Sequence, residues 1–512
     1  MSLISMEFML FVLLAVTGYY LIPKKYQWMW LLGFSYLYYI SGGIKITFFL
    51  LFSTITTYAA GRMLENVSMQ GLEKKLAKHK KKMILITALF LNFGMLGVLK
   101  YANFAIHTAN ELFHTGYADV NLLLPLGISF YTFQSMGYIL DVYWGRCKAE
   151  QNVFRFALFV SFFPQILQGP IGRFSTLGKQ LYEEHHLNQI MIERGLQRIL
   201  WGYFKKLIIA DNAVIFVDAI FGDPQKYNGL SIIGLLAYSI QLYCDFSGGM
   251  DVVIGIAQMF GIRLDENFKR PYFAISITDF WHRWHITLGT WMKDYIFYPI
   301  SLSKWMNRFG KFAKKICGKQ IGRTLPICLA NIIVFLVVGI WHGAAWKYII
   351  YGLYNGGIIA FSGLMAPAYK KWKTALHIND KSVGFHLFQI IRTFILVNIS
   401  WFFDRAFDIR TALLMMKNSV LHFNLGQIFQ PGIVVGESGG TAYTAVTIGV
   451  ILAGCMVVFM VSVLEERGKD MGAYVLKCPA AMRTAFYMMV LFMLPMLGQP
   501  AAVAGGFIYA QF

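Results

Sequence analysis

Charged side chains are scarce in this sequence. They make up 14% of its 512 residues, whereas soluble globular domains contain about a quarter. Hydrophobic residues make up 57%, and they form runs long enough to cross a bilayer. The composition therefore excludes an ordinary soluble protein and predicts a polytopic membrane protein.

Acidic residues are the scarcer of the two kinds of charge. The chain has 26 Asp and Glu against 46 Lys and Arg, and its net charge is +20. Membrane proteins carry such an excess of Lys and Arg in their cytoplasmic loops, so we expect no nucleic acid partner. Basic clusters lie at 24–25, 62–82, 304–323 and 370–373. Placing them in the cytoplasm puts the N-terminus outside.

Several common signatures are missing. The six cysteines show no CxxC pair and no metal-like spacing, so no disulfide framework follows. The absence of G-x-S-x-G and of a Walker loop removes the usual support for nucleophilic-serine and nucleotide-hydrolysis chemistry. We recognise no internal repeat and no soluble domain of about 50 residues or more. One integral-membrane domain, residues 1–512, is expected.

The start of the chain lacks the features of a signal peptide. Met1 to Glu7 contains no basic residue, and the first apolar run ends at Pro23-Lys24-Lys25 without a small-residue cleavage signature. We therefore expect a retained first helix.

The apolar runs predict an all-α bundle of about 11 transmembrane helices with additional re-entrant and interfacial helices. The predicted spans lie at about 6–22, 28–40, 46–60, 83–99, 121–140, 230–262, 384–402, 441–463 and 484–498, with two more in a hairpin over 325–365.

Three segments depart from a simple span. The run 153–168 ends at Gln168-Gly169-Pro170, which predicts a re-entrant piece. Basic and apolar residues alternate within 183–223, which predicts an amphipathic helix at the cytoplasmic interface. Asp245 and Asp251 flank a glycine pair deep in 230–262, which predicts a broken helix or a cavity wall.

His342 is the ionisable residue that stands out most. It lies in the apolar hairpin 325–365, with no local residue that offers a salt bridge, so it requires a distant partner or a water-filled cavity. It stands about 17 residues, or about 26 Å of helical rise, from the inner end of the hairpin. A functional imidazole and a core histidine bonded to a backbone carbonyl remain the two alternatives.

A second histidine-rich segment reads Trp281-His282-Arg283-Trp284-His285. Helical spacing places His282 and His285 near one face and pairs Asp279 with Arg283. An interfacial aromatic belt is the structural alternative. The HxxH spacing gives only two nitrogens, and no further ligand follows at motif spacing, so no metal is expected. Asp245 either orients a histidine, pairs with a basic group or caps a helix.

One or two buried histidines suffice for O-acylation in a membrane. A neutral imidazole, with a reference pKa of about 6.5, can accept the proton of an alcohol near neutral pH. An acyl thioester is already activated, so the reaction requires no bound cofactor.

The sequence resembles the membrane-bound O-acyltransferase (MBOAT) family, in particular its bacterial alginate O-acetylation (AlgI-like) branch, and more distantly the D-alanyl transferases. The motifs that carry the resemblance are Ser129–Gln134, Phe162–Gln165 with Gln168–Ile171, Tyr243–Gly248, Asp279–Leu288, Gly339–Gly343 and Phe507–Phe512. Position 282 is a histidine where this branch commonly has arginine.

The resemblance implies a ring-shaped helical bundle with a thin centre, a cytoplasmic tunnel for the acyl donor and an outer funnel for the acceptor. It implies that His342 and His285 are catalytic. Supporting or substrate-binding positions are Asp245, Trp281, His282, Arg283, Trp341, Asn355 and Gln134.

The expected activity is transfer of an acyl group, preferably acetyl, from acetyl-CoA or an acyl carrier protein thioester to an exported or cell-surface polysaccharide. The expected partners are membrane lipids, the donor, a secreted SGNH-type acetyltransferase and the polysaccharide, in a bacterial inner membrane. D-alanyl transfer to teichoic acid is one alternative. A transporter or flippase with a proton relay, which predicts inverted repeats, is another.

Overall fold

The structure, a computed structural model, describes residues 1–429, 441–499 and 507. Its regular elements over these ranges are helices, and the β pairing described is an isolated bridge between Phe268 and Trp284. The predicted all-α fold is confirmed.

The helices of the first half of the chain are α1 (Met6–Leu21), α2 (Gln27–Ser41), α3 (Ile44–Met69), α4 (Lys74–Phe113), α5 (Ile128–Tyr143), α6 (Val153–Ser161), α7 (Lys179–Tyr182), α8 (Gln189–Tyr203), α9 (Asp211–Gly222) and α10 (Ser231–Met259). A π-helical turn, η3 (Phe204–Ala210), joins α8 to α9.

The helices of the second half are α11 (Ile277–Arg283), α12 (Ile286–Met292), α13 (Tyr298–Ser301), α14 (Lys304–His342), α15 (Trp346–Ala375), α16 (Val383–Arg405), α17 (Ile409–Leu421), α18 (Thr441–Glu466), α19 (Met471–Lys477) and α20 (Ala480–Leu497).

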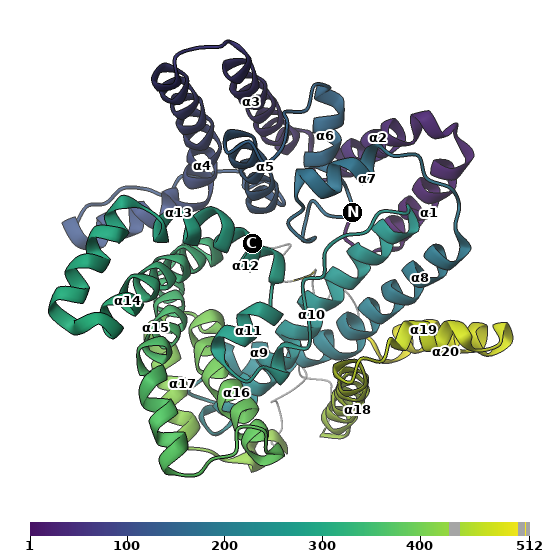
Figure 1. The fold of residues 1–512 in the computed structure, drawn as a ribbon. Helices are drawn as coiled ribbons and strands as arrows, with labels where there is room; N and C mark the ends of the chain where they lie inside the picture. Colours follow the sequence, from purple (N-terminus) through teal and green to yellow (C-terminus); the bar gives the residue numbers. More distant parts are fainter. Residues whose placement is uncertain (430–440, 500–506, 508–512) are drawn as a thin grey trace.

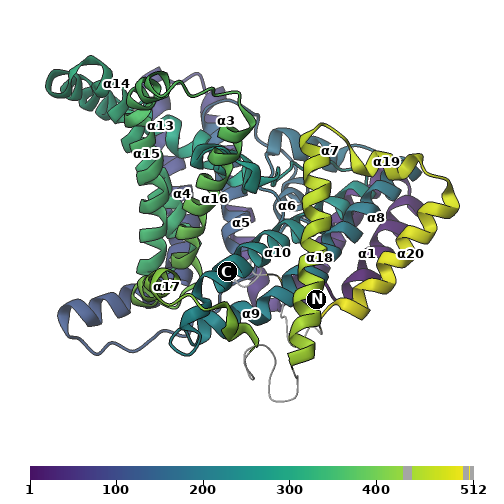
Figure 2. The ribbon, with the colours of Figure 1, turned by 90° about the horizontal axis from the view of Figure 1, so that it is seen from below.

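The long helices stand around a centre that contains the short helices α11 and α12 (Figure 1). On one side α3, α4 and α5 pack together, and α14 pairs with α15. On the other side α8 lies along α10, while α18, α19 and α20 form the periphery (Figures 1 and 2). This arrangement brings segments far apart in sequence to one central region.

Each of the eleven predicted spans contains a helix. Among the described residues, eight helices are long and apolar enough to cross a membrane. The helices α1, α2 and α5 have only 16, 15 and 16 residues, slightly short of the roughly 20 that a perpendicular span requires. The chain is a multi-pass membrane protein.

Of the two alternatives for 230–262, a broken helix or a cavity wall, the structure excludes the broken helix. α10 runs without interruption from Ser231 to Met259, and two of its glycines, Gly248 and Gly255, pack closely against α8. A Cβ on Gly248 would lie 2.7 Å from the carbonyl oxygen of Gly202, and one on Gly255 would lie 2.6 Å from that of Gly195. Glycine thus lets the two backbones touch.

The segment 183–223, predicted to contain an amphipathic interfacial helix, contains α8, and two of its basic residues lie beyond that helix in η3. Lys205 and Lys206 are buried, at 4% and 2% exposure, so they do not face the membrane surface. Lys205 pairs with Asp251 at 2.6 Å, and Lys206 pairs with Asp245 at 2.7 Å. The carboxylates of α10 pair with these ammonium groups, and this pairing allows the two lysines to be buried.

The predicted re-entrant segment is a short helix followed by irregular backbone. α6 ends at Ser161, and residues 162–171 continue as buried turns and coil. Gln165 donates a hydrogen bond to Gln134, and the amide of Phe163 donates one to Ser35. Protein atoms therefore cover this non-helical backbone, as a membrane environment requires.

Candidate active site

His342 is the last residue of α14, where that helix turns into α15. Glycines make the two helices a tight pair: Gly339 faces the carbonyl of Tyr348, and Gly352 faces the carbonyl of Phe335. The imidazole is 9% exposed and packs against the ring of Tyr351, at 5.0 Å between ring centroids. The histidine therefore has a fixed position at a helix end within an apolar hairpin.

The distant partner that His342 requires is Asp404, at the end of α16. Nδ1 of His342 lies 3.8 Å from a carboxylate oxygen of Asp404. The other carboxylate oxygen accepts a hydrogen bond of 2.7 Å from Tyr238, and the ammonium of Lys347 donates to the Asp404 backbone carbonyl at 3.0 Å. A carboxylate beside Nδ1 favours a proton on that nitrogen, which leaves Nε2 as the proton acceptor.

A small cavity adjoins His342. It is lined by Lys100 of α4, by residues 127–130 at the start of α5, and by Trp341 and His342. Lys100 donates a hydrogen bond of 2.6 Å to the carbonyl oxygen of Trp341. Polar groups from three separate helices therefore meet beside the imidazole.

His285 lies between α11 and α12 rather than within a helix. Its backbone φ is +46°, a conformation that residues other than glycine rarely adopt. Residues held in such a conformation are concentrated at functional sites. The imidazole is 2% exposed. Burial, together with the nearby His342, lowers the pKa of His285 to about 3, so the ring is neutral near pH 7.

Asn267 fixes the orientation of His285. Its side-chain oxygen accepts from the amide and the hydroxyl of Thr287, at 3.0 and 2.9 Å, and lies 3.3 Å from Nδ1 of His285. An amide oxygen can only accept, so this contact assigns the proton of the neutral ring to Nδ1. Nε2 then carries the lone pair.

Trp341 lies between the two histidines. The centroid of its ring is 5.6 Å from that of His285 and 5.1 Å from that of His342. Phe130 packs against both Trp341 and His285. The structure thus brings together the two histidines that the sequence singled out, with Trp341 as their common neighbour.

His282 and His285 do not share a helix face, contrary to our expectation. α11 ends at Arg283, and the chain becomes extended at Trp284 before the left-handed turn at His285. His282 is exposed, whereas His285 points into the core. The predicted pair of Asp279 and Arg283 is present at 3.0 Å, and Arg283 also binds Glu466 of α18.

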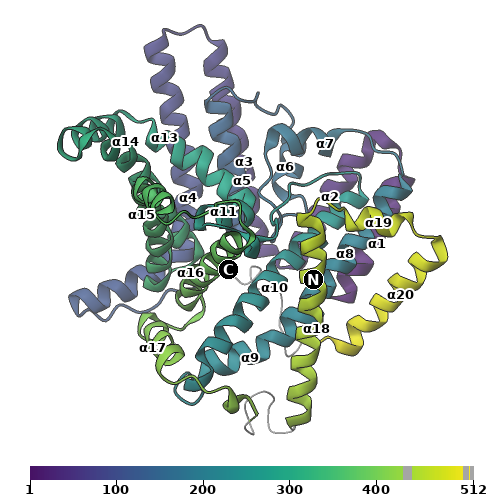
Figure 3. The same ribbon diagram turned by 60° about the horizontal axis from the view of Figure 1, so that its bottom comes forward.

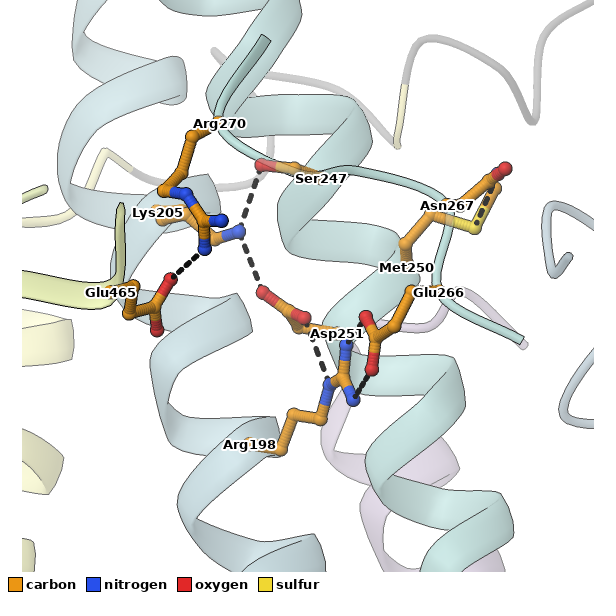
Figure 4. Close-up of polar contacts among 9 residues, drawn as sticks. All are labelled: Arg198, Lys205, Ser247, Met250, Asp251, Glu266, Asn267, Arg270 and Glu465. Carbon is orange, nitrogen blue, oxygen red and sulfur yellow. Dashed lines mark hydrogen bonds and ion pairs between the residues drawn. The ribbon is translucent and has the colours of Figure 1, made fainter. Parts of the chain in front are cut away.

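Asp245 pairs with Lys206 and belongs to a different polar cluster. Asp211 binds the same ammonium at 2.7 Å. Nearby, Asp251 lies between Lys205 and Arg198, and Arg198 also binds Glu266 (Figure 4). Of the three roles open to Asp245, pairing with a basic group is therefore the one observed.

The remaining candidates, Trp281, Asn355 and Gln134, form hydrogen bonds within the bundle. Trp281 donates a hydrogen bond of 3.3 Å to the side chain of Asn355, which itself donates to the carbonyl of Tyr351 at 3.0 Å. Gln134 donates to the carbonyl of Phe159 at 2.5 Å. Among the described residues, no group of three or more His, Cys, Asp and Glu is arranged to hold a metal ion.

Sequence reasoning missed Asp404, Asn267 and Lys100. Asp404 and Lys100 each stand at the end of an apolar run, next to predicted spans 384–402 and 83–99, and that position was the available signal. Asn267 carried no signal, because an asparagine in a polar loop is common. A base with a carboxylate partner and a second oriented imidazole can activate a hydroxyl and position its reaction partner.

Comparison with known proteins agrees with this chemistry. The model of the membrane-bound O-acyltransferase family matches residues 151–313. The "Probable alginate O-acetylase AlgI" of Pseudomonas aeruginosa is 35% identical over 78% of this chain and 71% of that protein. The peptidoglycan O-acetyltransferase of Helicobacter pylori is 33% identical over 80% of this chain and 76% of that protein.

A more distant relative is the teichoic acid D-alanyltransferase of Bacillus subtilis. It is 30% identical over 49% of this chain and 62% of that protein. The extent of these matches shows that the chain belongs to the membrane-bound O-acyltransferase family. It is an O-acyltransferase, and this membership decides against the transporter alternative.

The closing motif of the resemblance, Phe507–Phe512, lies outside the described residues except for Phe507. That residue is 2% exposed, and its ring lies 5.0 Å from the ammonium of Lys206.

Proposed function

We propose that this enzyme passes an acetyl group from a cytoplasmic thioester across the membrane for O-acylation of an exported or cell-surface polysaccharide. The observation that carries the proposal is a buried imidazole, His342, that has both a carboxylate partner and an adjoining cavity. The relatives that match most of the chain are named as alginate and peptidoglycan O-acetylating proteins, which favours acetyl over D-alanyl.

In this proposal His342 accepts the proton of the attacking hydroxyl. Asp404 stabilises the imidazolium that forms, because a carboxylate 3.8 Å from Nδ1 favours the charged ring. His285, held with its lone pair on Nε2, accepts a hydrogen bond from the donor and so positions the thioester. Polarisation of the donor carbonyl by His285 would require the other tautomer, so positioning is the role that we favour.

The donor is acetyl-CoA or an acyl carrier protein thioester. Both are anionic, and the basic segments 74–82 and 304–323 would attract either one electrostatically. The α3–α4 turn and the first part of α14 lie on the same side of the bundle (Figure 3). We propose that this side faces the cytoplasm of a bacterial cell, with the N-terminus outside, and that residues 1–512 act as one domain.

The acceptor is the polysaccharide itself or a secreted SGNH-type acetyltransferase that completes the transfer. We favour the secreted partner because a polymer chain is bulky, whereas a small cavity beside His342 suits a single hydroxyl group.

In the decisive experiment, the purified protein is reconstituted in liposomes and given either labelled acetyl-CoA or an acyl carrier protein that carries a labelled acetyl group. Transfer of label to a hydroxyl acceptor on the opposite side of the membrane supports the proposal and identifies the donor. If neither donor transfers its label while the protein is folded and correctly inserted, the proposed donor class is wrong.

Replacement of His342 by alanine tests the assigned base. We expect acetyl transfer to fall by about 100-fold or more, because a positioned general base contributes about 10²–10⁴ to the rate. The control is His386→Ala, an exposed histidine on α16, and a thermal unfolding scan checks both variants for folding. Wild-type activity in the folded His342→Ala protein would refute the role of His342.

A further inference from the structure

A lysine lines the cavity beside His342. Lys100 stands within α4, one of the helices that can cross a membrane. Its ammonium donates to the carbonyl of Trp341 and lies 5.9 Å from the ring centroid of Tyr101 and 6.0 Å from that of Trp341; no ion pair of Lys100 with a carboxylate is found among the described residues. An ammonium inside a membrane protein without a counter-ion is costly, so this position requires an explanation.

The start of α5 faces the same cavity. Gly127, with φ of +72°, ends the preceding loop and begins the helix, and residues 127–130 line the cavity. The amino end of a 16-residue helix carries the positive pole of the helix dipole. Two positive features, from α4 and from α5, therefore converge on one small space.

Ser129 supplies a donor in the same place. It lines the cavity, is 6% exposed, and its hydroxyl has no hydrogen-bond partner among the described residues. Buried hydroxyls are usually satisfied. Because Ser129 lines the same cavity as Lys100, its unsatisfied hydroxyl points to a ligand that accepts hydrogen bonds.

The size of the cavity limits what this ligand is. About 20 Å³ is open to the centre of a water-sized atom, and a single water requires about 10–15 Å³ by this measure. That space holds one or two oxygen atoms, such as those of an attacking hydroxyl and of an acyl carbonyl.

We propose that Lys100, Ser129 and the amino end of α5 form an oxyanion site for the acyl group. This inference rests on the proposed function. The hydroxyl oxygen attacks the thioester carbonyl carbon while His342 takes the hydroxyl proton. The electron pair of the carbonyl moves onto its oxygen, which the ammonium of Lys100 and the hydroxyl of Ser129 then stabilise. The intermediate collapses, the carbonyl re-forms, and the departing thiolate takes the proton from His342.

A purely structural role for Lys100 is the competing explanation. Its bond to the Trp341 carbonyl caps the end of α14, and cations at a helix carboxyl end stabilise the helix. A cap accounts for Lys100, but it does not account for the unsatisfied Ser129 hydroxyl in the same cavity. The two explanations predict different effects on the rate and on the stability.

The test compares Lys100→Gln and Ser129→Ala with the control Ser135→Ala in the liposome assay. Glutamine retains a donor for the Trp341 carbonyl but removes the charge. Ser135, further along α5, is also buried and lacks a partner among the described residues, but it does not line the cavity. We expect kcat to fall by about 100-fold for Lys100→Gln and by at least about 10-fold for Ser129→Ala, since one oxyanion donor contributes about 10²–10³.

A second measurement separates an oxyanion site from a structural effect. With a fluoroacetyl thioester, whose oxyanion is intrinsically more stable, both variants should lose several-fold less activity than with the acetyl thioester. The KM and the unfolding midpoint should stay near those of the wild type. An equal loss for both thioesters, or a lower unfolding midpoint with unchanged kcat, would overturn the oxyanion site.

The failures of the two proposals are distinguishable. If Lys100→Gln and Ser129→Ala transfer acetyl at the wild-type rate while His342→Ala does not, the proposed function stands and the oxyanion site is wrong. If the wild-type protein transfers no acyl group from either donor, the proposed function itself is wrong.

Discussion

The two histidines differ in how the protein holds them. His342 is held through the packing of α14 against α15 and through Asp404. His285 lies beside Asn267, whose side-chain oxygen accepts from both donors of Thr287 and lies 3.3 Å from Nδ1 of the imidazole. The amide of Ile286 also donates to the Asn267 backbone carbonyl at 3.0 Å. Asn267 is therefore a positioning residue for the left-handed turn at His285.

Replacement of Asn267 tests this role. We expect Asn267→Ala to lower kcat by about 100-fold, because a displacement of about 1 Å in a reacting group can cost that much. Asn267→Asp keeps the accepting oxygen and should retain most of the activity. The measurement is kcat and KM in liposomes, with the unfolding midpoint as a check on folding. Equal losses in the alanine and aspartate variants would contradict a positioning role.

The sequence predicted individual site residues where their residue type is uncommon in the surrounding segment. His342 and His285 stood out because imidazoles are uncommon in apolar and aromatic-rich segments. Their partners did not stand out, since an asparagine in a loop or an aspartate after a span has many ordinary roles. Which oxygen meets which nitrogen depends on the packing of α10, α12, α14 and α16, and no local pattern contains that information.

At the scale of elements, the packing of α8 and η3 against α10 explains two differences from the expectations. Gly195 and Gly202 of α8 meet Gly255 and Gly248 of α10, so the two backbones approach closely and α10 stays unbroken. The same approach brings Lys205 and Lys206 to the carboxylates of α10. A hydropathy pattern treats each helix separately. It therefore favoured a surface position for Lys205 and Lys206 and allowed a break at Gly248-Gly249.

Gly202 offers a direct test of this close contact. A Cβ there would lie 2.5 Å from the carbonyl oxygen of Gly248. We expect Gly202→Ala to lower the free energy of unfolding by about 1–3 kcal/mol, because overpacking forces neighbouring groups apart. The control is Gly97→Ala on α4, where a Cβ meets nothing within 4 Å. Equal unfolding midpoints for the two detergent-solubilised variants would show that the contact carries no such constraint.

At the scale of the whole molecule, charge is distributed unevenly between the two sides. The basic starts of α4 and α14 lie on one side, and the segment 114–127 that follows α4 lies away from it (Figure 3). The basic segments 62–82 and 304–323 are largely helical: a short turn separates α3 from α4, and Gly318 interrupts α14 within its basic part. The excess of positive charge on one side remains the basis of the orientation that we propose.

Cys317 gives a test of that orientation. It is exposed and lies in the basic part of α14. In a variant whose other cysteines are alanine, a membrane-impermeant maleimide should label Cys317 only in inside-out vesicles. A Gly116→Cys variant without Cys317 should be labelled only in intact cells with a permeable outer layer. Labelling of Cys317 from outside would reverse the proposed topology.

The sequence by itself determined the class of this protein, its helical spans and its rare imidazoles. These follow from hydrophobicity and local spacing, which act along the chain. The tertiary structure decided the partner of His342, the tautomer of His285, the burial of Lys205 and Lys206, and the cavity beside Lys100. Each of these depends on residues separated along the chain that pack within a few ångströms of one another, and electrostatic and hydrogen-bond energies change steeply over that distance.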